Sequence, residues 1–175
     1  RELINKEKTS QPNNLVSLYL ENYIDFFTVF LNENEKEFRE LEPQKEIRLA
    51  KIISDNPNSP FYLYLQAEIE IQWAFSRLKF GEYVKAAYEL YKAHTLLEEN
   101  ITKYPNFKPN IKSIGLMQVI IGSIPDRYKW GANLMGFSTD TEEGLSDLAS
   151  MLKTVPTEFH HINTEAKILL SFILM

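Results

Sequence analysis

Apolar residues recur every three or four positions along most of this chain, and this spacing limits its fold more than any other feature. From Leu15 the apolar positions continue at 18, 19, 23, 26, 27, 30 and 31. Such spacing gathers side chains on one face of a helix, whereas a strand would show strict alternation. Prolines fall between these runs, as expected where helices start and stop. The sequence therefore predicts an all-α fold of antiparallel helix pairs, stacked as an irregular superhelix of about eight helices.

The loops between the predicted helices are recognisable from their residues. Ser59 can cap a helix whose first position is Pro60. A tight turn is predicted at residues 80–82, and Thr139 with Glu142 forms a capping box. Pro43 is a possible break in the second helix. The predicted helices cover residues 12–31, 35–54, 60–79, 83–103, 110–122, 126–134, 139–153 and 156–175.

The two ends of the chain differ from its middle. Residues 1–11 are polar, and we predict a flexible segment there, followed by a single helical-repeat domain over residues 12–175. The chain starts at Arg1 without a methionine, and it ends in an apolar run from Ile168 with no capping residue. An apolar helix end needs a cover, so we expect this chain to be a fragment of a longer protein, or its end to contact another subunit.

Composition and charge exclude several classes of function. The chain has no cysteine, which excludes zinc–thiolate sites, thiol redox motifs and cysteine nucleophiles. Its net charge is −5 with acidic and basic residues interspersed, so we expect no nucleic-acid partner. No run of 18 apolar residues occurs, so we expect no transmembrane span in this segment. The compartment stays open between cytoplasm, periplasm and a membrane surface reached through a missing N-terminal segment.

The middle of the chain carries small residues at the spacing of a helix–turn–helix repeat. Alanines on both predicted helices would let their backbones approach closely, with a glycine and a tyrosine at the turn. On this pattern residues 67–93 resemble a tetratricopeptide repeat, a unit of about 34 residues. Trp73 departs from the leucine usual in that repeat, and Glu98 from its closing proline. The matching residues are Ala67, Ala74, Gly81, Tyr83, Ala86, Leu90 and Ala93.

A second, degenerate unit is predicted over residues 108–135, with Gly115 at its small position and Gly122 at its turn. Beyond it, a Gly136-Phe137 pair precedes Asp140 and a Gly-Leu-x-x-Leu run at residues 144–148. This combination resembles a eukaryotic family of tetratricopeptide proteins associated with the outer mitochondrial membrane and with clearance of inclusion bodies and lipid droplets. The resemblance implies a non-enzymatic role and relatives longer than this chain.

In stacked helix pairs the first helix of each pair lines the concave face, where ligands bind. We therefore predict exposed partner-binding residues on two first helices, suited to charge and apolar contacts along a groove. Aromatic residues near prolines and glycines at helix junctions either pack the loops or present a second binding surface. The predicted groove residues are Glu68, Ile71, Phe75, Lys79, Lys112, Leu116 and Val119. The junction aromatics are Tyr104, Phe107, Tyr128 and Trp130.

Several sharper motifs have ordinary explanations. His160 and His161 with Glu165 could hold a metal, but a polar surface turn explains them as well, and we predict no metal or cofactor. Asn100 begins a glycosylation sequon inside a predicted helix, which favours chance. The aromatic stripe at Tyr19, 23, 26, 27 and 30 could bind an apolar ligand, although such stripes more often form core.

No catalytic motif is present: the chain contains neither Gly-x-Ser-x-Gly nor a phosphate-binding Gly-x-x-x-x-Gly-Lys. We expect a non-enzymatic scaffold that binds a protein or peptide. Two alternatives remain open at this point. One is an envelope or organelle-surface component that binds lipid or glycan. The other is an enzyme whose residues converge only in three dimensions.

Overall fold

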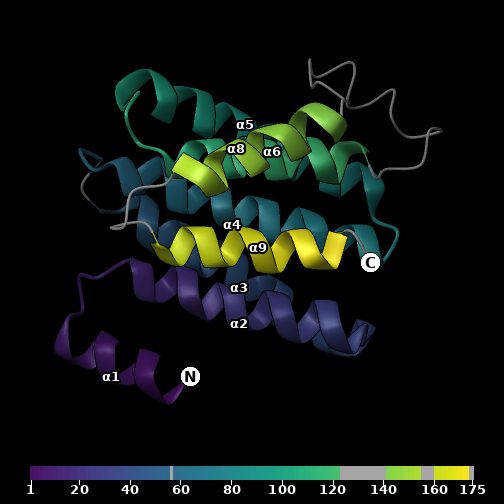
Figure 1. Cartoon of the computed structure of the whole chain (residues 1–175). Coiled ribbons are helices and arrows are strands. Elements are labelled where there is room, and N and C mark those ends of the chain that lie inside the picture. The colour runs from purple at the N-terminus through teal and green to yellow at the C-terminus, as the bar shows by residue number, and fades with distance from the viewer. Residues whose placement is uncertain (56, 123–140, 155–159, 174–175) are drawn as a thin grey trace. The chain divides into compact units, whose positions relative to one another are not determined.

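The computed structural model describes residues 1–55, 57–122, 141–154 and 160–173. The regular secondary structure of these residues is entirely α-helical, which confirms the predicted all-α class (Figure 1). The predicted helix at 126–134 and the capping residue Thr139 lie outside the described residues. The helices are α1 (Glu2–Ser10), α2 (Val16–Asn32), α3 (Glu35–Ile53), α4 (Pro60–Lys79), α5 (Tyr83–Lys103), α6 (Pro109–Gly122), α8 (Thr141–Thr154) and α9 (His160–Ile173).

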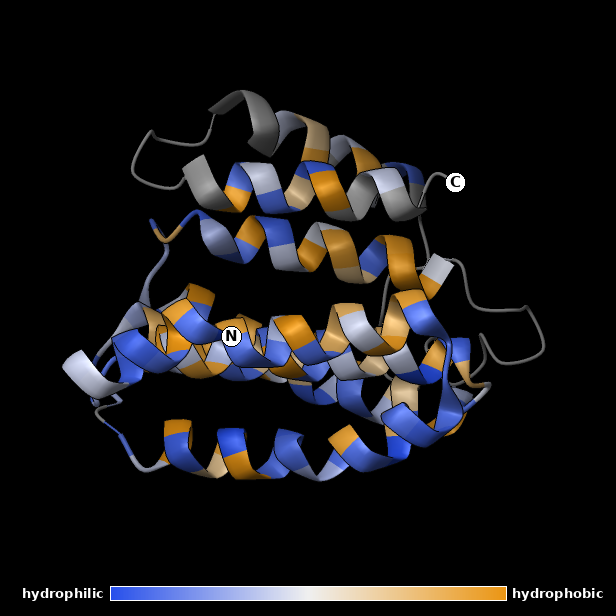
Figure 2. Cartoon of the chain, turned by 90° about the horizontal axis from the view of Figure 1, so that it is seen from below, coloured by the Kyte–Doolittle hydropathy of each residue, from blue (hydrophilic) through white to orange (hydrophobic). Residues whose placement is uncertain are grey.

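The chain divides into two compact units, residues 1–96 and residues 97–175. The sequence predicted one helical-repeat domain over residues 12–175, and that domain organisation stays a prediction. The first unit contains α1 to α4 and most of α5, and the second contains the end of α5 with α6, α8 and α9. Along the described helices, hydrophobic and hydrophilic residues alternate in patches, as amphipathic packing requires (Figure 2).

Local signals set the helix ends that the sequence predicted. The Ser59 hydroxyl accepts a hydrogen bond from the Phe61 backbone N–H, and Pro60 occupies the first turn of α4. The Asn34 side chain caps α3 in the same way. Between α4 and α5, Gly81 has φ +70°, a left-handed conformation that favours glycine. The predicted turn at residues 80–82 is therefore confirmed.

Three features of the first unit differ from the prediction. No helix was predicted within residues 1–11, but residues 2–10 form α1, with Glu2 in the first turn and Lys8 in the last, where each suits the helix dipole. Pro12 lies in the turn before α2 instead of in its first turn. Pro43 lies inside α3 without ending it. It is exposed, so water can satisfy the Arg39 carbonyl that Pro43 leaves without a donor.

The core of the first unit forms where α2, α3 and α4 pack against one another. Phe38 of α3 is fully buried, and its ring stacks on Phe80 with 4.5 Å between ring centroids. It also packs against Trp73 of α4, at 5.8 Å. Trp73 is the departure from the tetratricopeptide pattern noted above. It fills space beside Phe38, and its indole N–H donates to the Asn22 side-chain oxygen at 3.0 Å.

The five alanine and leucine residues that carry the repeat resemblance are buried, whereas Gly81 is exposed and Tyr83 is half-buried. In the first unit α4 and α5 form the predicted helix–turn–helix, and ion pairs Arg77–Glu89 and Lys92–Glu70 connect the two helices. The alanines at the helix contact have no exposed surface, and Leu90 is also buried. These small or apolar core residues are Ala67, Ala74, Ala86, Leu90 and Ala93.

In the second unit α6 packs against α8 and α9, and α8 packs against α9. Gly115 of α6 and Gly144 of α8 mark the closest approach. A Cβ atom at Gly115 would lie 3.0 Å from the Gly144 carbonyl oxygen and 2.9 Å from Leu148 Cγ. A Cβ atom at Gly144 would lie 2.8 Å from Gln118 Cβ. The backbones of α6 and α8 are therefore in direct contact, and any larger side chain would push them apart.

Candidate functional site

The predicted concave face does not form an exposed surface. Glu68 and Ile71 are buried, because α4 is the central helix of the first unit and contacts α2 and α3 while pairing with α5. Phe75 is half-buried and stacks on Phe30 at 4.9 Å. Lys79 alone is exposed among the four predicted α4 positions, and its Nζ lies 2.5 Å from a Glu33 carboxylate oxygen. The expectation of an exposed groove along α4 is therefore wrong.

The corresponding α6 positions are also buried. Lys112, Leu116 and Val119 are each 5% exposed or less. Lys112 Nζ lies 2.7 Å from Glu165 Oε1, so this lysine joins α6 to α9 and is not presented at a surface. This ion pair also argues against a metal ion at Glu165, because the Glu165 carboxylate already pairs with Lys112 of the same protein. His160 and His161 side chains lie outside the described residues, and the described part of the chain holds no group of metal ligands.

The junction aromatics and the sequon behave as packing residues where they are described. Phe107 is buried and Tyr104 is half-buried. Tyr128 and Trp130 lie outside the described residues. Asn100 has no exposed surface, and its side-chain N–H donates to the Asn110 side-chain oxygen at 2.9 Å. A buried asparagine is not available for glycosylation in the folded state, which agrees with the interpretation of the sequon as chance.

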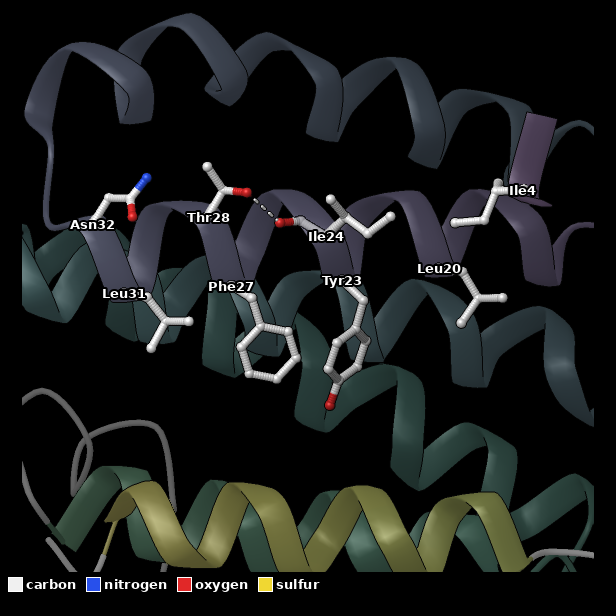
Figure 3. Close-up of a pocket in the computed structure, with 8 residues that line it drawn as sticks. All are labelled: Ile4, Leu20, Tyr23, Ile24, Phe27, Thr28, Leu31 and Asn32. Carbon is white, nitrogen blue, oxygen red and sulfur yellow. Dashed lines mark hydrogen bonds between the residues drawn. The ribbon is translucent and has the colours of Figure 1, made fainter. Parts of the chain in front are cut away.

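An open apolar groove of about 550 Å³ lies on the first unit, along the outer face of α2 (Figure 3). Its volume falls within the range of ordinary ligand pockets. The lining is mostly aliphatic and aromatic. At the end nearest the C-terminus of α2 it also includes one aliphatic hydroxyl and one amide. That hydroxyl, Thr28 Oγ1, donates to the Ile24 carbonyl at 2.8 Å. The lining residues are Ile4, Leu20, Tyr23, Ile24, Phe27, Thr28, Leu31 and Asn32.

The groove divides the aromatic stripe that the sequence assigned to the core. Tyr19, Phe26 and Phe30 are buried between helices, as expected. Tyr23 and Phe27 are half-buried and line the groove instead. The signal in the sequence was that α2 is apolar around most of its circumference, which is more than one core-facing stripe requires. The side chains of Leu20 and Leu31, which also line the groove, are 44% and 58% exposed.

A buried network of charges connects α3, α4 and α5 in the first unit. Lys45 is 3% exposed, and its Nζ lies 2.5 Å from a Glu70 oxygen and 2.7 Å from a Glu89 oxygen. Arg77 pairs with the same Glu89 at 2.8 Å and with Glu82 at 2.5 Å. Burial raises the pKa of the Glu89 carboxyl, against the opposing effect of Lys45 and Arg77. Each charge faces an opposite charge of the protein, so the network links the three helices through ion pairs.

A smaller polar cluster lies between α2, α3 and α4. The Arg48 guanidinium contacts Asp25 at 2.5 Å and the Asn22 side-chain oxygen at 3.1 Å. Asn22 in turn donates to the Gln72 side-chain oxygen at 2.6 Å. Asn22 and Asp25 have no exposed surface. Neither cluster opens onto the apolar groove, whose lining is a different set of residues.

A comparison with known protein families, curated proteins and solved structures finds no match to this chain. The resemblances to tetratricopeptide proteins thus rest on the sequence pattern and stay predictions. No helix in the described part of the chain is both long and apolar enough to cross a membrane.

Proposed function

We propose that this chain is a non-enzymatic helical scaffold, similar to tetratricopeptide proteins, that binds a protein or peptide partner. The observation that carries the proposal is the apolar groove on the outer face of α2. Apolar side chains held in an open groove suit a partner's apolar anchors, which exclude water on binding. The helix–turn–helix of α4 and α5 supports the tetratricopeptide part of the proposal, since its ends and its buried alanines match the predicted unit.

The chemistry of the side chains favours binding over catalysis. The polar groups in the groove are the Tyr23 hydroxyl, the Thr28 hydroxyl and the Asn32 amide, and Thr28 is already engaged by backbone. General acid–base catalysis needs a group that exchanges protons near neutral pH within reach of a substrate. The titratable side chains of Lys45, Glu70 and Glu89 lie close together in the first unit, and they are buried in mutual ion pairs.

The test uses substitutions in the groove with a matched control. A photo-crosslinking residue at Leu31 would capture the partner in a cell extract, and the captured segment would then be made as a synthetic peptide. We expect Leu20→Asp or Leu31→Asp to weaken binding of that peptide about tenfold, because each buries a charge among apolar side chains. Val84→Asp is the control, since Val84 is 76% exposed on α5 and does not line the groove.

The outcomes separate the proposal from its alternatives. Equal binding by all three variants would remove the groove from consideration. An envelope or organelle-surface component would instead bind lipid vesicles, and the groove substitutions would then reduce vesicle binding while no peptide is captured. Circular dichroism and a urea midpoint for each variant confirm that the helices are intact before binding is compared.

A further inference from the structure

The side of α2 next to the apolar groove carries two acidic residues, and α1 pairs with both of them. Glu21 is half-buried, whereas Asp25 is fully buried and also pairs with Arg48 of α3. Lys8 Nζ of α1 lies 2.7 Å from Glu21 Oε1. The Arg1 guanidinium, at the start of α1, lies 2.5 Å from Asp25 Oδ1. Between these two basic residues Ile4 lines the groove. Positions 1, 4 and 8 share one side of a helix, as do positions 21 and 25.

The contacts with α1 define a pattern of charged and apolar residues along α2. We define the α2 stripe as Leu20, Glu21, Ile24, Asp25 and Leu31. Residue 1 lies near residue 25 and residue 8 near residue 21, so α1 runs antiparallel to α2. The stripe therefore holds an amphipathic helix with an apolar residue between two basic ones, seven positions apart.

The contacts of α1 with α2 are few enough that we expect another helix to be able to replace α1. Every residue of α1 is at least partly exposed, and Leu3 retains 82% of its exposure. The Lys8–Glu21 pair is partly exposed on both sides, and such ion pairs contribute little and are screened by salt. The groove continues along α2 beyond Asp25. It reaches Thr28 and Leu31, which lie past the residues of α2 that pair with α1.

We propose that the α2 stripe recognises a basic amphipathic helix of a partner protein, and that α1 occupies the same acidic residues until the partner displaces it. This inference rests on the proposed function, because it names the partner of the same groove. The charge pattern selects the ligand: Glu21 and Asp25 face basic residues, and Leu20, Ile24 and Leu31 face apolar ones. A partner helix that also contacted Leu31 would bury an apolar side chain that is 58% exposed in the structure.

The first experiment tests whether the ion pair holds α1 in place. In the full chain, Lys8→Glu and Glu21→Lys each set like charges against one another, whereas the double variant restores a pair of opposite charges. We expect amide hydrogen exchange over residues 2–10 to accelerate about threefold in each single variant and to return to the original rate in the double variant. Lys36→Glu is the control, because its Nζ pairs with Glu40 on α3. Unchanged exchange in both single variants would overturn the inference.

The second experiment supplies the ligand in trans. The probe is a fluorescent, end-capped peptide of residues 1–11, measured by anisotropy. Both single variants release α1, but only Glu21→Lys removes the acidic residue. We expect the peptide to bind the Lys8→Glu chain about fivefold more tightly than the Glu21→Lys chain, and more tightly than the unchanged chain, whose own α1 competes. A peptide carrying Lys8→Glu should recover binding to the Glu21→Lys chain.

The results distinguish this inference from the proposed function. Equal affinity for the two single variants, or no binding to the Lys8→Glu chain at millimolar peptide, overturns the inference. The captured partner segment is then decisive for the broader proposal. If Leu31→Asp weakens its binding and Glu21→Lys does not, the groove binds a partner but not through basic residues. If neither substitution has an effect, both proposals fail.

Discussion

Lys45 Nζ lies 2.7 Å from Glu89 Oε1 and joins α3 to α5 inside the first unit. Both side chains are almost fully buried, at 3% and 4% exposure. The contact places a positive charge of one helix between the carboxylates of two others, since Glu70 of α4 lies on its other side. This arrangement fixes the register of α3 against the α4–α5 pair, because a shift of one helix would leave buried charges unpaired.

The first prediction concerns that network. Glu89→Ala removes the carboxylate that both Lys45 and Arg77 contact, and leaves two buried cations with fewer partners. We expect a loss of about 3 kcal/mol in the free energy of unfolding. Urea denaturation followed by far-ultraviolet circular dichroism measures it.

The control for this prediction is Glu40→Ala, which breaks the Lys36–Glu40 pair on the exposed side of α3. It should change stability by less than about 1 kcal/mol. Similar losses in the two variants would mean that the buried pair contributes no more than a surface pair. Replacing Lys45 by Met together with Glu89 by Leu should cost less than Glu89→Ala alone, because no isolated charge is then left at that contact.

The second prediction concerns acid stability. Glu82 accepts hydrogen bonds from Arg39 and Arg77, and although burial opposes them, these bonds lower the pKa of its carboxyl below the ordinary 4.5. A lowered pKa in the folded state means that the unfolded state binds the proton more tightly. The stabilisation by Glu82 is therefore complete above pH 4.5 and is lost as the pH falls through the lower, folded-state pKa.

The measurement is the urea midpoint between pH 3 and pH 6, compared with a Glu82→Gln variant. The unchanged chain should lose stability relative to that variant below about pH 4.5, by roughly 1 kcal/mol. Glu40→Gln serves as the matched control, since Glu40 is 64% exposed and pairs only loosely with Lys36 at 3.8 Å. Parallel curves for the unchanged chain and the Glu82→Gln variant would contradict the assignment.

The third prediction concerns the turn between α4 and α5. Gly81 adopts φ +70°, which a side chain with a Cβ atom disfavours. We expect Gly81→Ala to lower the free energy of unfolding by about 1 kcal/mol and Gly81→Asn by less, because asparagine tolerates this conformation. Space around the residue is not limiting, since the nearest side-chain atom to a Cβ would be Tyr83 Cε2 at 3.9 Å. An equal loss in both variants would indicate a cause other than backbone conformation.

Local signals explain why most helix ends could be predicted. Ser59-Pro60 and Gly81 act through their own backbone geometry, so their effect does not depend on the rest of the fold. The helix at residues 2–10 was missed because its polar sequence has no strong signal of its own. It is held by partners in α2, such as Glu21, that sequence proximity does not indicate.

Burial of charged residues was the main failure in predicting the site. Glu68 and Lys112 were expected at a surface because each lies on the first helix of a predicted helix pair, which lines the concave face of a helical repeat. Periodicity identifies which residues share a helix face, but it does not reveal that Lys112 would meet Glu165, a residue 53 positions away. The groove was missed for a related reason, since Tyr23 and Phe27 have the same spacing as the buried Phe26 and Phe30.

The last prediction concerns the contact between α6 and α8. A Cβ atom at Gly115 or Gly144 would lie 3.0 Å or less from atoms of the facing helix, some of them backbone. Gly115→Ala and Gly144→Ala should each destabilise the second unit by about 2 kcal/mol, although alanine is the better helix former. Ser146→Ala is the control, because Ser146 is exposed on α8 and its replacement should change stability by less than about 0.5 kcal/mol.

Amide hydrogen exchange in α6 and α8 localises the effect to this unit. Both glycine variants should accelerate exchange there and leave α2 and α3 unchanged, because those helices belong to the first unit. The double variant should lose less than the sum of the two single losses. The two Cβ atoms meet the same helix contact, so once the first has separated the backbones the second finds more room. Full additivity would show that the two glycines act independently and that the close approach is not shared.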